Sequence, residues 1–445
     1  MQQLNGTSFV SSRGFQQHAW FYRILPSVAH RPLERIYSGN YFETNFAPSN
    51  PKVQFAPKEL AWDPFDLPDE NESVDFVQGI RTIGGHGDPT TKEGLAVHIY
   101  TANTSMEKRA FCSTDGDMLL LPQHGRLDIQ TEMGKMMVRP GELAVIQAGL
   151  RFKVSLPDGP SRGYIQEIFG AHYELPELGV VGSNGCALPR DFEYPLAHFD
   201  IDQSPWTIVY KLCGELFACQ QDHTPFDVVA WHGNYAPYKY QLERFINVAH
   251  VDRDQSDPTC YCVLTAKSKI PGVALTEFLI FTPKWIATQN TFRPPYYHRN
   301  VASEVMGMMY GEWKGTGHVL APGGLSYEPS FLPHGESQER FLEAASWELK
   351  PERIMQNTMA FMMHINSHLS MTNFALKDSG KLHLSPADMW DNVRGGFLNH
   401  LETINKELSA SGRDPLNIRE LASKVPLANG VKCAGVPNGI NGHVK

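Results

Sequence analysis

The sequence predicts a mainly β protein, built from β-sandwiches or barrels, with helix confined to its late part. Glycine (37) and proline (31) are spread through the 445 residues in short turn-forming groups. Between these groups lie short apolar runs rich in Val, Ile, Leu and Phe, such as 95–103 and 261–283. Short strands separated by frequent turns are typical of sandwiches and barrels.

Residues 117–156 carry the clearest strand pattern. Polar and apolar residues alternate around two turns, MGK and RPGE, as expected for hairpins with one buried face. We therefore expect a β-sandwich core in this segment.

Helical periodicity occurs late, over residues 386–408. Met389, Val393, Phe397, Leu401 and Ile404 recur at steps of three and four residues, which predicts a C-terminal surface helix. Residues 421–445 end in a Gly/Asn-rich stretch without an apolar face, so we expect a mobile tail.

The chain is about three times as long as a typical domain of ~150 residues, which indicates two or three modules. We place an N-terminal β-rich domain at 1–220 and a C-terminal domain at 221–420, followed by the tail.

Composition excludes several classes of function. Lys and Arg (39) are outnumbered by Asp and Glu (48), the net charge is −9, and basic residues do not cluster, so nucleic acid is not an expected partner. No apolar window of ~18 residues and no export signal are visible, which predicts a cytoplasmic protein without a membrane partner. The seven cysteines lack a regular framework, and we expect reduced thiols.

Two histidines and one glutamate could form a metal site. His298 and Glu304 are six residues apart, so on an extended strand both side chains face the same side. His334 follows the turn-forming PGG and would lie on a neighbouring strand or loop. Two imidazoles and one carboxylate form the face that binds Fe(II) and leaves adjacent positions open. On spacing alone, a core histidine, a solvated glutamate and a loop histidine that never meet remain an alternative.

His232 is a candidate general base. It lies between Trp231 and Gly233 in PFDVVAWHGNYAPYKYQL (225–242), after an apolar strand. An unperturbed imidazole titrates near pH ~6.5, which suits removal of a proton from a bound phenol. A structural histidine packed against Trp231 is the alternative.

Several separated motifs resemble the homogentisate 1,2-dioxygenase family. They are WFYRILPSVAHRP (20–32), STDGDMLLLPQHG (113–125), LPRDF (188–192), PFDVVAWHGNYAPYKY (225–240) and TFRPPYYHRN (291–300). The resemblance runs from about residue 2 to about 395. It implies a β-rich N-terminal domain, a C-terminal cupin (jelly-roll) domain that holds one non-haem Fe(II), and a homo-oligomer (trimer or dimer of trimers).

The same resemblance implies roles for individual residues. The family's iron ligands fall on His298, Glu304 and His334, and its catalytic histidine falls on His232. Asn300 and Tyr297, in the PPYYHRN block, are candidates for the substrate pocket; Asn300 could orient substrate or a ligand, or could cap a turn.

This sequence departs from the family pattern at the expected pocket. Trp313, Thr316 and Glu328 stand where the family has Tyr, Lys and His, and His364 stands where it has Glu. Losing a cation and gaining a carboxylate should disfavour an anionic substrate, because two like charges at ~4 Å cost ~4 kcal/mol at an effective dielectric of ~20. The alternative is that these changes are neutral drift at positions that do not contact the substrate, or that Glu328 pairs with His364 or Lys314.

Together these features predict an Fe(II) dioxygenase that opens a para-dihydroxylated, hydroquinone-type aromatic ring with both atoms of O₂. We expect a preference for a neutral substituent such as methyl or methoxy. The first alternative is the family's own activity on homogentisate, in the catabolism of tyrosine and phenylalanine. A non-catalytic cupin binding protein and a metal-dependent isomerase are alternatives from other classes.

Overall fold

The computed structural model describes residues 1–37, 42–178, 187–244, 261–287, 297–312, 320–335, 337–346, 348, 350–383, 397–417 and 420–421. The chain divides into two compact units, Met1–Ser385 and Pro386–Lys445. Among the described residues there is no helix long and apolar enough to cross a membrane.

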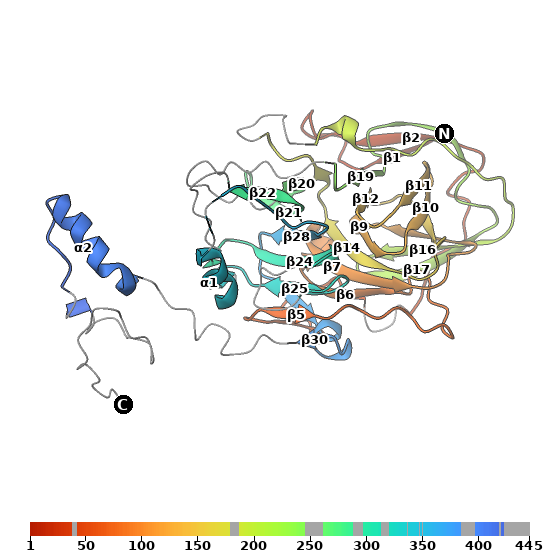
Figure 1. Cartoon of the computed structure of the whole chain (residues 1–445). Helices are drawn as coiled ribbons and strands as arrows, with labels where there is room; N and C mark the ends of the chain where they lie inside the picture. The colour runs from red at the N-terminus through yellow and green to blue at the C-terminus, as the bar shows by residue number, and fades with distance from the viewer. Residues whose placement is uncertain are drawn as a thin grey trace. The chain divides into compact units, whose positions relative to one another are not determined.

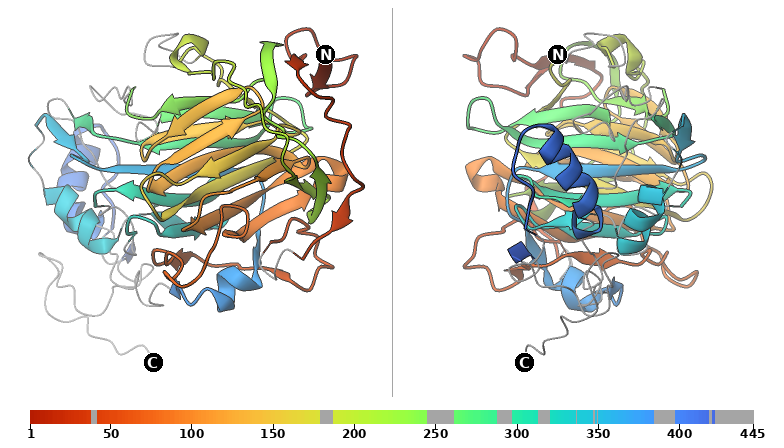
Figure 2. Two further views of the ribbon diagram at one scale, coloured as in Figure 1. Left: turned by 90° about the vertical axis from the view of Figure 1, so that its right-hand side faces the viewer. Right: turned by 60° about the vertical axis from the view of Figure 1, so that its left-hand side comes forward.

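An eight-stranded central sheet lies in the middle of the first unit, and both of its faces are buried. Alternate residues of β7 enter two different cores: Leu95, Val97 and Ile99 face one, and Tyr100 faces the other. Figures 1 and 2 show the stacked sheets. The strand order is β19 (Tyr238–Gln241), β12 (Glu142–Ile146), β9 (Gly116–His124), β14 (Ser161–Phe169), β7 (Glu93–Ala102), β6 (Ile80–Asp88), β29 (Ser370–Thr372) and β4 (Val53–Phe55).

A seven-stranded outer sheet and a three-stranded N-terminal sheet pack on one side of the central sheet. They share a core that includes Phe111 and Phe152 of the outer sheet and Phe21 of the N-terminal sheet. The outer sheet runs β11 (Gly134–Val138), β10 (Leu127–Thr131), β13 (Phe152–Ser155), β8 (Arg109–Ser113), β16 (Trp206–Leu212), β17 (Glu215–Gln221) and β3 (Glu34–Arg35); the N-terminal sheet runs β1 (Gln2–Asn5), β2 (His18–Arg23) and β18 (Val228–Gly233).

An eight-stranded C-terminal sheet packs on the other side of the central sheet. Val305 and Phe361 face the shared core, whereas Met306 and Met308 face a separate cluster on the far side of the sheet. The order is β15 (Tyr173–Glu174), β20 (Tyr261–Lys267), β21 (Ala274–Phe281), β28 (Met359–Ile365), β24 (Ser303–Tyr310), β25 (Leu325–Glu328), β5 (Leu60–Trp62) and β30 (Leu382–His383).

Two short ribbons and a few helices complete the described elements. The ribbons pair β22 (Lys284–Ala287) with β27 (Glu352–Ile354), and β23 (Tyr297–His298) with β26 (His334–Gly335). The helices are η1 (Pro89–Thr91), η2 (Pro189–Asp191), α1 (Gln338–Ser346), the π-helix η3 (Phe374–Asp378), η4 (Phe397–His400) and α2 (Leu401–Ala410).

The predicted mainly β class is confirmed by the stacked sheets, but the details of residues 117–156 differ. The MGK turn joins the antiparallel pair β10 and β11, as expected. The RPGE turn does not close a hairpin, because β11 lies in the outer sheet and β12 in the central sheet. Strands β9 and β12 also bury both faces rather than one, since the central sheet is covered on both sides.

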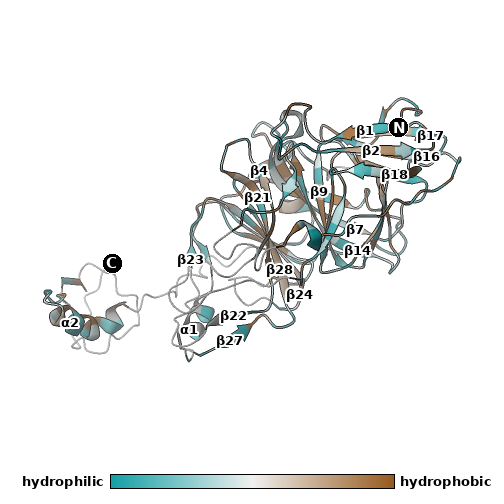
Figure 3. Ribbon diagram, turned by 90° about the horizontal axis from the view of Figure 1, so that it is seen from above, coloured by the Kyte–Doolittle hydropathy of each residue, from teal (hydrophilic) through white to brown (hydrophobic). Residues whose placement is uncertain are grey.

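The late helix is confirmed in its described part. Helix α2 covers Leu401–Ala410 and is preceded by the 3₁₀ turn η4, while residues 386–396 of the predicted helix lie outside the described residues. Figure 3 shows hydrophilic and hydrophobic residues side by side along α2. Nearly all of the predicted tail (421–445) also lies outside them.

The boundary near residue 220 stays a prediction. Strands β5 and β15, from the first half of the chain, belong to the C-terminal sheet, and β29, from the second half, belongs to the central sheet. The two halves of the first unit therefore complete each other's sheets. Among the described residues, Cys112, Cys213 and Cys219 are free thiols.

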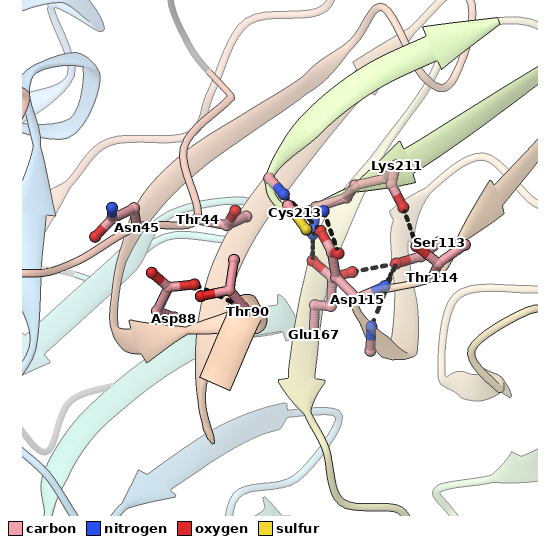
Figure 4. Close-up of polar contacts among 12 residues, drawn as sticks. Thr44, Asn45, Asp88, Thr90, Ser113, Thr114, Asp115, Glu167, Lys211 and Cys213 are labelled. Carbon is pink, nitrogen blue, oxygen red and sulfur yellow. Dashed lines mark hydrogen bonds and ion pairs between the residues drawn. The ribbon is translucent and has the colours of Figure 1, made fainter. Parts of the chain in front are cut away.

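A buried charge network joins the outer and central sheets (Figure 4). Lys211 Nζ, on β16, lies 2.6 Å from Asp115 Oδ2 and 2.8 Å from Glu167 Oε2, and its side chain is fully buried. His98 Nε2 lies 3.5 Å from the same oxygen of Glu167. Burial raises the pKa of Glu167, but the charge of Lys211 and the hydrogen bond with His98 outweigh it and lower that pKa to about 2.

We predict that Lys211→Met lowers the free energy of unfolding by about 3–5 kcal/mol, because two buried carboxylates lose their cation. Urea unfolding followed by tryptophan fluorescence measures the change. The matched control is Lys267→Met: Lys267 is half-exposed and pairs with Glu174 at 2.9 Å, and such pairs contribute about 0–1 kcal/mol. Equal losses in the two variants would contradict the stabilising role of the buried network.

Candidate metal centre

The ribbon of β23 and β26 brings two histidines together. His298 and His334 are direct cross-strand partners, and their ring centroids are 4.4 Å apart. The side chain of His334 is 6% exposed and that of His298 is 35% exposed. The pair therefore has one buried imidazole and one imidazole that solvent can reach.

Glu304, on β24 of the C-terminal sheet, supplies a carboxylate to this pair. Its Oε1 lies 3.4 Å from His298 Nε2 and its Oε2 lies 3.4 Å from His334 Nε2. One ligand atom from each of the three residues lies within 4.8 Å of the other two, which is close enough for a single ion to contact all three. The structure thus brings together the three residues that the sequence predicted as ligands.

The surroundings of His334 suit a metal ligand. Its Nδ1 lies 2.9 Å from the Leu332 carbonyl, so this nitrogen carries a proton and donates, which directs Nε2 toward Glu304. Nε2 is buried, and its contact with Glu304 Oε2 at 3.4 Å is too long to satisfy it fully. An ion at this position would satisfy it.

The charges of the triad balance each other without an ion. Burial lowers the pKa of His334, but the hydrogen bond and charge of Glu304 raise it to about 9. Burial raises the pKa of Glu304, while hydrogen bonds from His298, His334 and Asn300 hold it well below its usual range. Metal binding at neutral pH therefore has to release the proton of His334, and metal affinity should fall as the pH falls.

Ionisable residues form a row across the C-terminal sheet on the face that carries Glu304. In register, Glu328 lies opposite Glu304 on one side and His364 lies opposite it on the other. His364 in turn lies opposite Glu277, and its Nδ1 is 2.8 Å from Glu277 Oε2. The alternative pairing of Glu328 with His364 is therefore wrong, because Glu304 stands between them.

Glu59 extends this row and was missed by the sequence analysis. It precedes β5, whose Leu60 pairs with Tyr327 of β25, so Glu59 reaches the position beside Glu328. Its charge acts on both His334 and Glu328. No local motif marks Glu59, because its place depends on pairing between strands that are far apart in the sequence.

Glu328 is a buried carboxyl group with a shifted pKa. The residue is 3% exposed, and burial, followed by the nearby charge of Glu304, raises its pKa well above the usual range. A bound dication would offset the effect of Glu304 but not the burial. A raised pKa weakens the repulsion of an anionic substrate that we expected from this residue.

The other pocket candidates have separate outcomes. Asn300 Nδ2 donates to Glu304 Oε1 at 2.5 Å, so Asn300 contacts a ligand. Tyr297 is 61% exposed and adjacent to His298 on β23; because successive strand residues point to opposite faces, it points away from the triad. Trp313, Thr316 and Lys314 lie outside the described residues.

The structure does not bring His232 to the triad of its own chain. His232 is an exposed residue of β18 in the N-terminal sheet, and its Nε2 lies 3.4 Å from Tyr22 Oη. Figure 3 places β18 away from β23. A general base must lie within hydrogen-bond reach of the proton that it removes, and within one chain His232 does not meet this condition.

Comparison with known proteins identifies close relatives. Two family models match the chain: "Homogentisate 1,2-dioxygenase N-terminal" over residues 1–242 and "Homogentisate 1,2-dioxygenase C-terminal" over 243–397. Proteins named homogentisate 1,2-dioxygenase from Mus musculus and Homo sapiens are each 45% identical over 399 residues, covering 89% of this chain and 88% of theirs. The Arabidopsis thaliana protein of that name is 47% identical over 420 residues, covering 92% and 90%.

Solved structures show a weaker likeness. Salicylate 1,2-dioxygenase from Pseudoaminobacter salicylatoxidans, solved as adducts with gentisate, is 10% identical and covers 72% of this chain and 83% of its own, with a TM-score of 0.34. A likeness at this level carries no inference about activity.

We predict that His298→Ala and His334→Ala each abolish stoichiometric metal binding, because each removes one of three protein ligands. Metal content after anaerobic loading with Fe(II) and desalting is the measurement. The control is His383→Ala, which removes a half-buried histidine of the C-terminal sheet, paired with Asp63 at 3.6 Å, and should leave metal binding normal. A full complement of iron in either ligand variant would show that the triad is not the metal site.

Proposed function

The chain belongs to the homogentisate 1,2-dioxygenase family and is a ring-cleaving dioxygenase; we propose that it opens the ring of homogentisate with O₂ at an Fe(II) held by His298, Glu304 and His334. The convergence of these three side chains in a chain about 45% identical to proteins of that name supports the proposal. Both atoms of O₂ enter the open-chain product, so no external reductant is required.

Fe(II) is the metal that this donor set favours. Two imidazoles and one carboxylate are the non-haem Fe(II) triad and leave adjacent coordination positions open. Bound Fe(II) supplies a Lewis acid for the substrate hydroxyl and a redox centre for O₂.

The protein side chains supply position and charge. The Leu332 carbonyl holds the imidazole of His334 in one tautomer, and Asn300 holds one oxygen of Glu304. With Glu304 ionised and both histidines neutral, the ligands carry one negative charge, which leaves a bound dication net positive. That positive charge favours binding of a substrate hydroxyl in its deprotonated form.

A hydroquinone with a neutral substituent is the second candidate substrate, and the acidic row favours it. The principal charges acting on His334 and Glu328 in the described part of the chain come from Glu304, Glu59 and each other, and no Lys or Arg is among them. A substrate carboxylate beside this row would therefore meet three acidic side chains, Glu304, Glu59 and Glu328. Against this candidate, burial raises the pKa of Glu328, which weakens the expected repulsion.

Homo-oligomerisation, as a trimer or dimer of trimers, and a cytoplasmic location stay proposals. His232 could serve as a general base only for the triad of a second copy, since it is exposed and remote from the triad of its own chain.

We expect one O₂ to be consumed per homogentisate by the Fe(II)-loaded protein, with methyl- and methoxyhydroquinone as slower substrates. An oxygen electrode with each compound in turn, compared by kcat/KM, measures this. The control is His334→Ala under the same loading, which should consume none. A higher kcat/KM for the neutral hydroquinones would replace homogentisate as the substrate and leave the iron assignment intact.

In the proposed homo-oligomer His232 acts on the triad of a second copy, so His232→Gln should keep its iron and lose kcat by the ~10²–10⁴-fold that follows removal of a general base. Iron content and kcat of the variant, measured beside the unmodified protein, test this. A loss of that size with full iron content would show that His232 of another copy completes the site. An unchanged kcat would exclude that role.

A further inference from the structure

Asn300 bonds to Glu304 and to the loop that leads to His334. It follows His298 by two residues, and its Nδ2 donates to Glu304 Oε1 at 2.5 Å. Its Oδ1 accepts from the Ala302 N–H at 3.1 Å. The second bond fixes the orientation of the amide, because only the nitrogen can then face the carboxylate.

The backbone of Asn300 holds the loop that leads to His334. The Asn300 carbonyl accepts from the Phe331 N–H at 2.8 Å, three residues before His334. Phe331 has a φ of 59°, a left-handed conformation that a side chain such as Phe adopts only when its neighbours hold it there. Ser330 Oγ donates to the Val301 carbonyl at 2.8 Å and ties the same two loops together.

Resting on the proposed function, we propose that Asn300 is the positioning residue that holds Glu304 by Oε1 and so presents Oε2, on the side of His334, to the metal. A carboxylate whose second oxygen is engaged by a hydrogen bond binds a metal through one oxygen. Each ligand then takes one position, and the remaining positions stay open for the substrate oxygen and O₂.

A neutral amide suits this task better than a charged group. The Nδ2 of Asn only donates hydrogen bonds, so it holds the Glu304 oxygen without binding the metal itself. A carboxylate at this position would compete for the metal. The amide also adds no positive charge that would oppose the dication. The amide of Asn300 therefore restrains Glu304 without changing the charge of the site.

Two substitutions separate the amide from the turn. Asn300→Ser keeps a side-chain oxygen that can accept from Ala302, but its hydroxyl is too short to reach Glu304. Asn300→Ala removes both interactions. The matched control is Asn45→Ala, because Asn45 Oδ1 accepts from the Ala47 N–H at 3.0 Å in the same kind of turn, on another loop.

The measurement is titration of the metal-free full chain with Co(II), followed by visible absorption, which reports both affinity and ligand geometry. We expect Asn300→Ser and Asn300→Ala to bind Co(II) about 10–100-fold more weakly, the usual cost of losing a group that orients a ligand. Their Co(II) spectra should differ from that of the unmodified protein, while Asn45→Ala should match it in both respects.

Asn300→Ser with unchanged affinity and spectrum would overturn the proposal, whether or not Asn300→Ala binds weakly, because the amide would then be dispensable. This outcome is distinct from failure of the proposed function. An unmodified protein that binds Co(II) but consumes no O₂ with homogentisate after Fe(II) loading would refute the activity and leave the role of Asn300 standing.

Discussion

The cross-strand pairing of His298 with His334 is the constraint on which the metal centre depends. Strands β23 and β26 have two residues each, and an isolated ribbon of this size has no stability of its own. Its geometry is imposed by the loops on either side, which Asn300 and Ser330 tie together, and by the C-terminal sheet, which presents Glu304. The site is therefore only as rigid as the contacts between two loops and one strand.

The ionisable row on the C-terminal sheet determines the electrostatic character of the site. Glu59, Glu328, Glu304, His364 and Glu277 occupy successive strands on one face. Glu304 is held ionised by the imidazoles and Asn300, whereas burial and the charge of Glu304 raise the pKa of Glu328. The pKa values of two neighbouring carboxyl groups are thus shifted in opposite directions, that of the proposed metal ligand Glu304 downward and that of Glu328 upward.

The three-layer architecture explains why this face is well placed. The central sheet buries one face against the outer and N-terminal sheets and the other against the C-terminal sheet. The opposite face of the C-terminal sheet is thereby left to form a separate cluster around Met306 and Met308, next to Glu304. Because β5 and β15 come from the first half of the chain, the metal-bearing sheet cannot form without it.

By itself, the sequence determined the mainly β class, and its spacing together with the family resemblance predicted the three side chains proposed to bind the metal. Alternation of polar and apolar residues reports which side chains share a face of one strand, and the spacing of His298 and Glu304 belongs to such a local pattern. Only the tertiary structure decided what lies beside them. Four features depend on which distant strands and loops pack together. They are the position of Glu59 beside Glu328, the pairing of His364 with Glu277, the distance of His232 from the triad and the two side-chain hydrogen bonds of Asn300. Packing of this kind is decided by burial over the whole chain, and no local pattern records it.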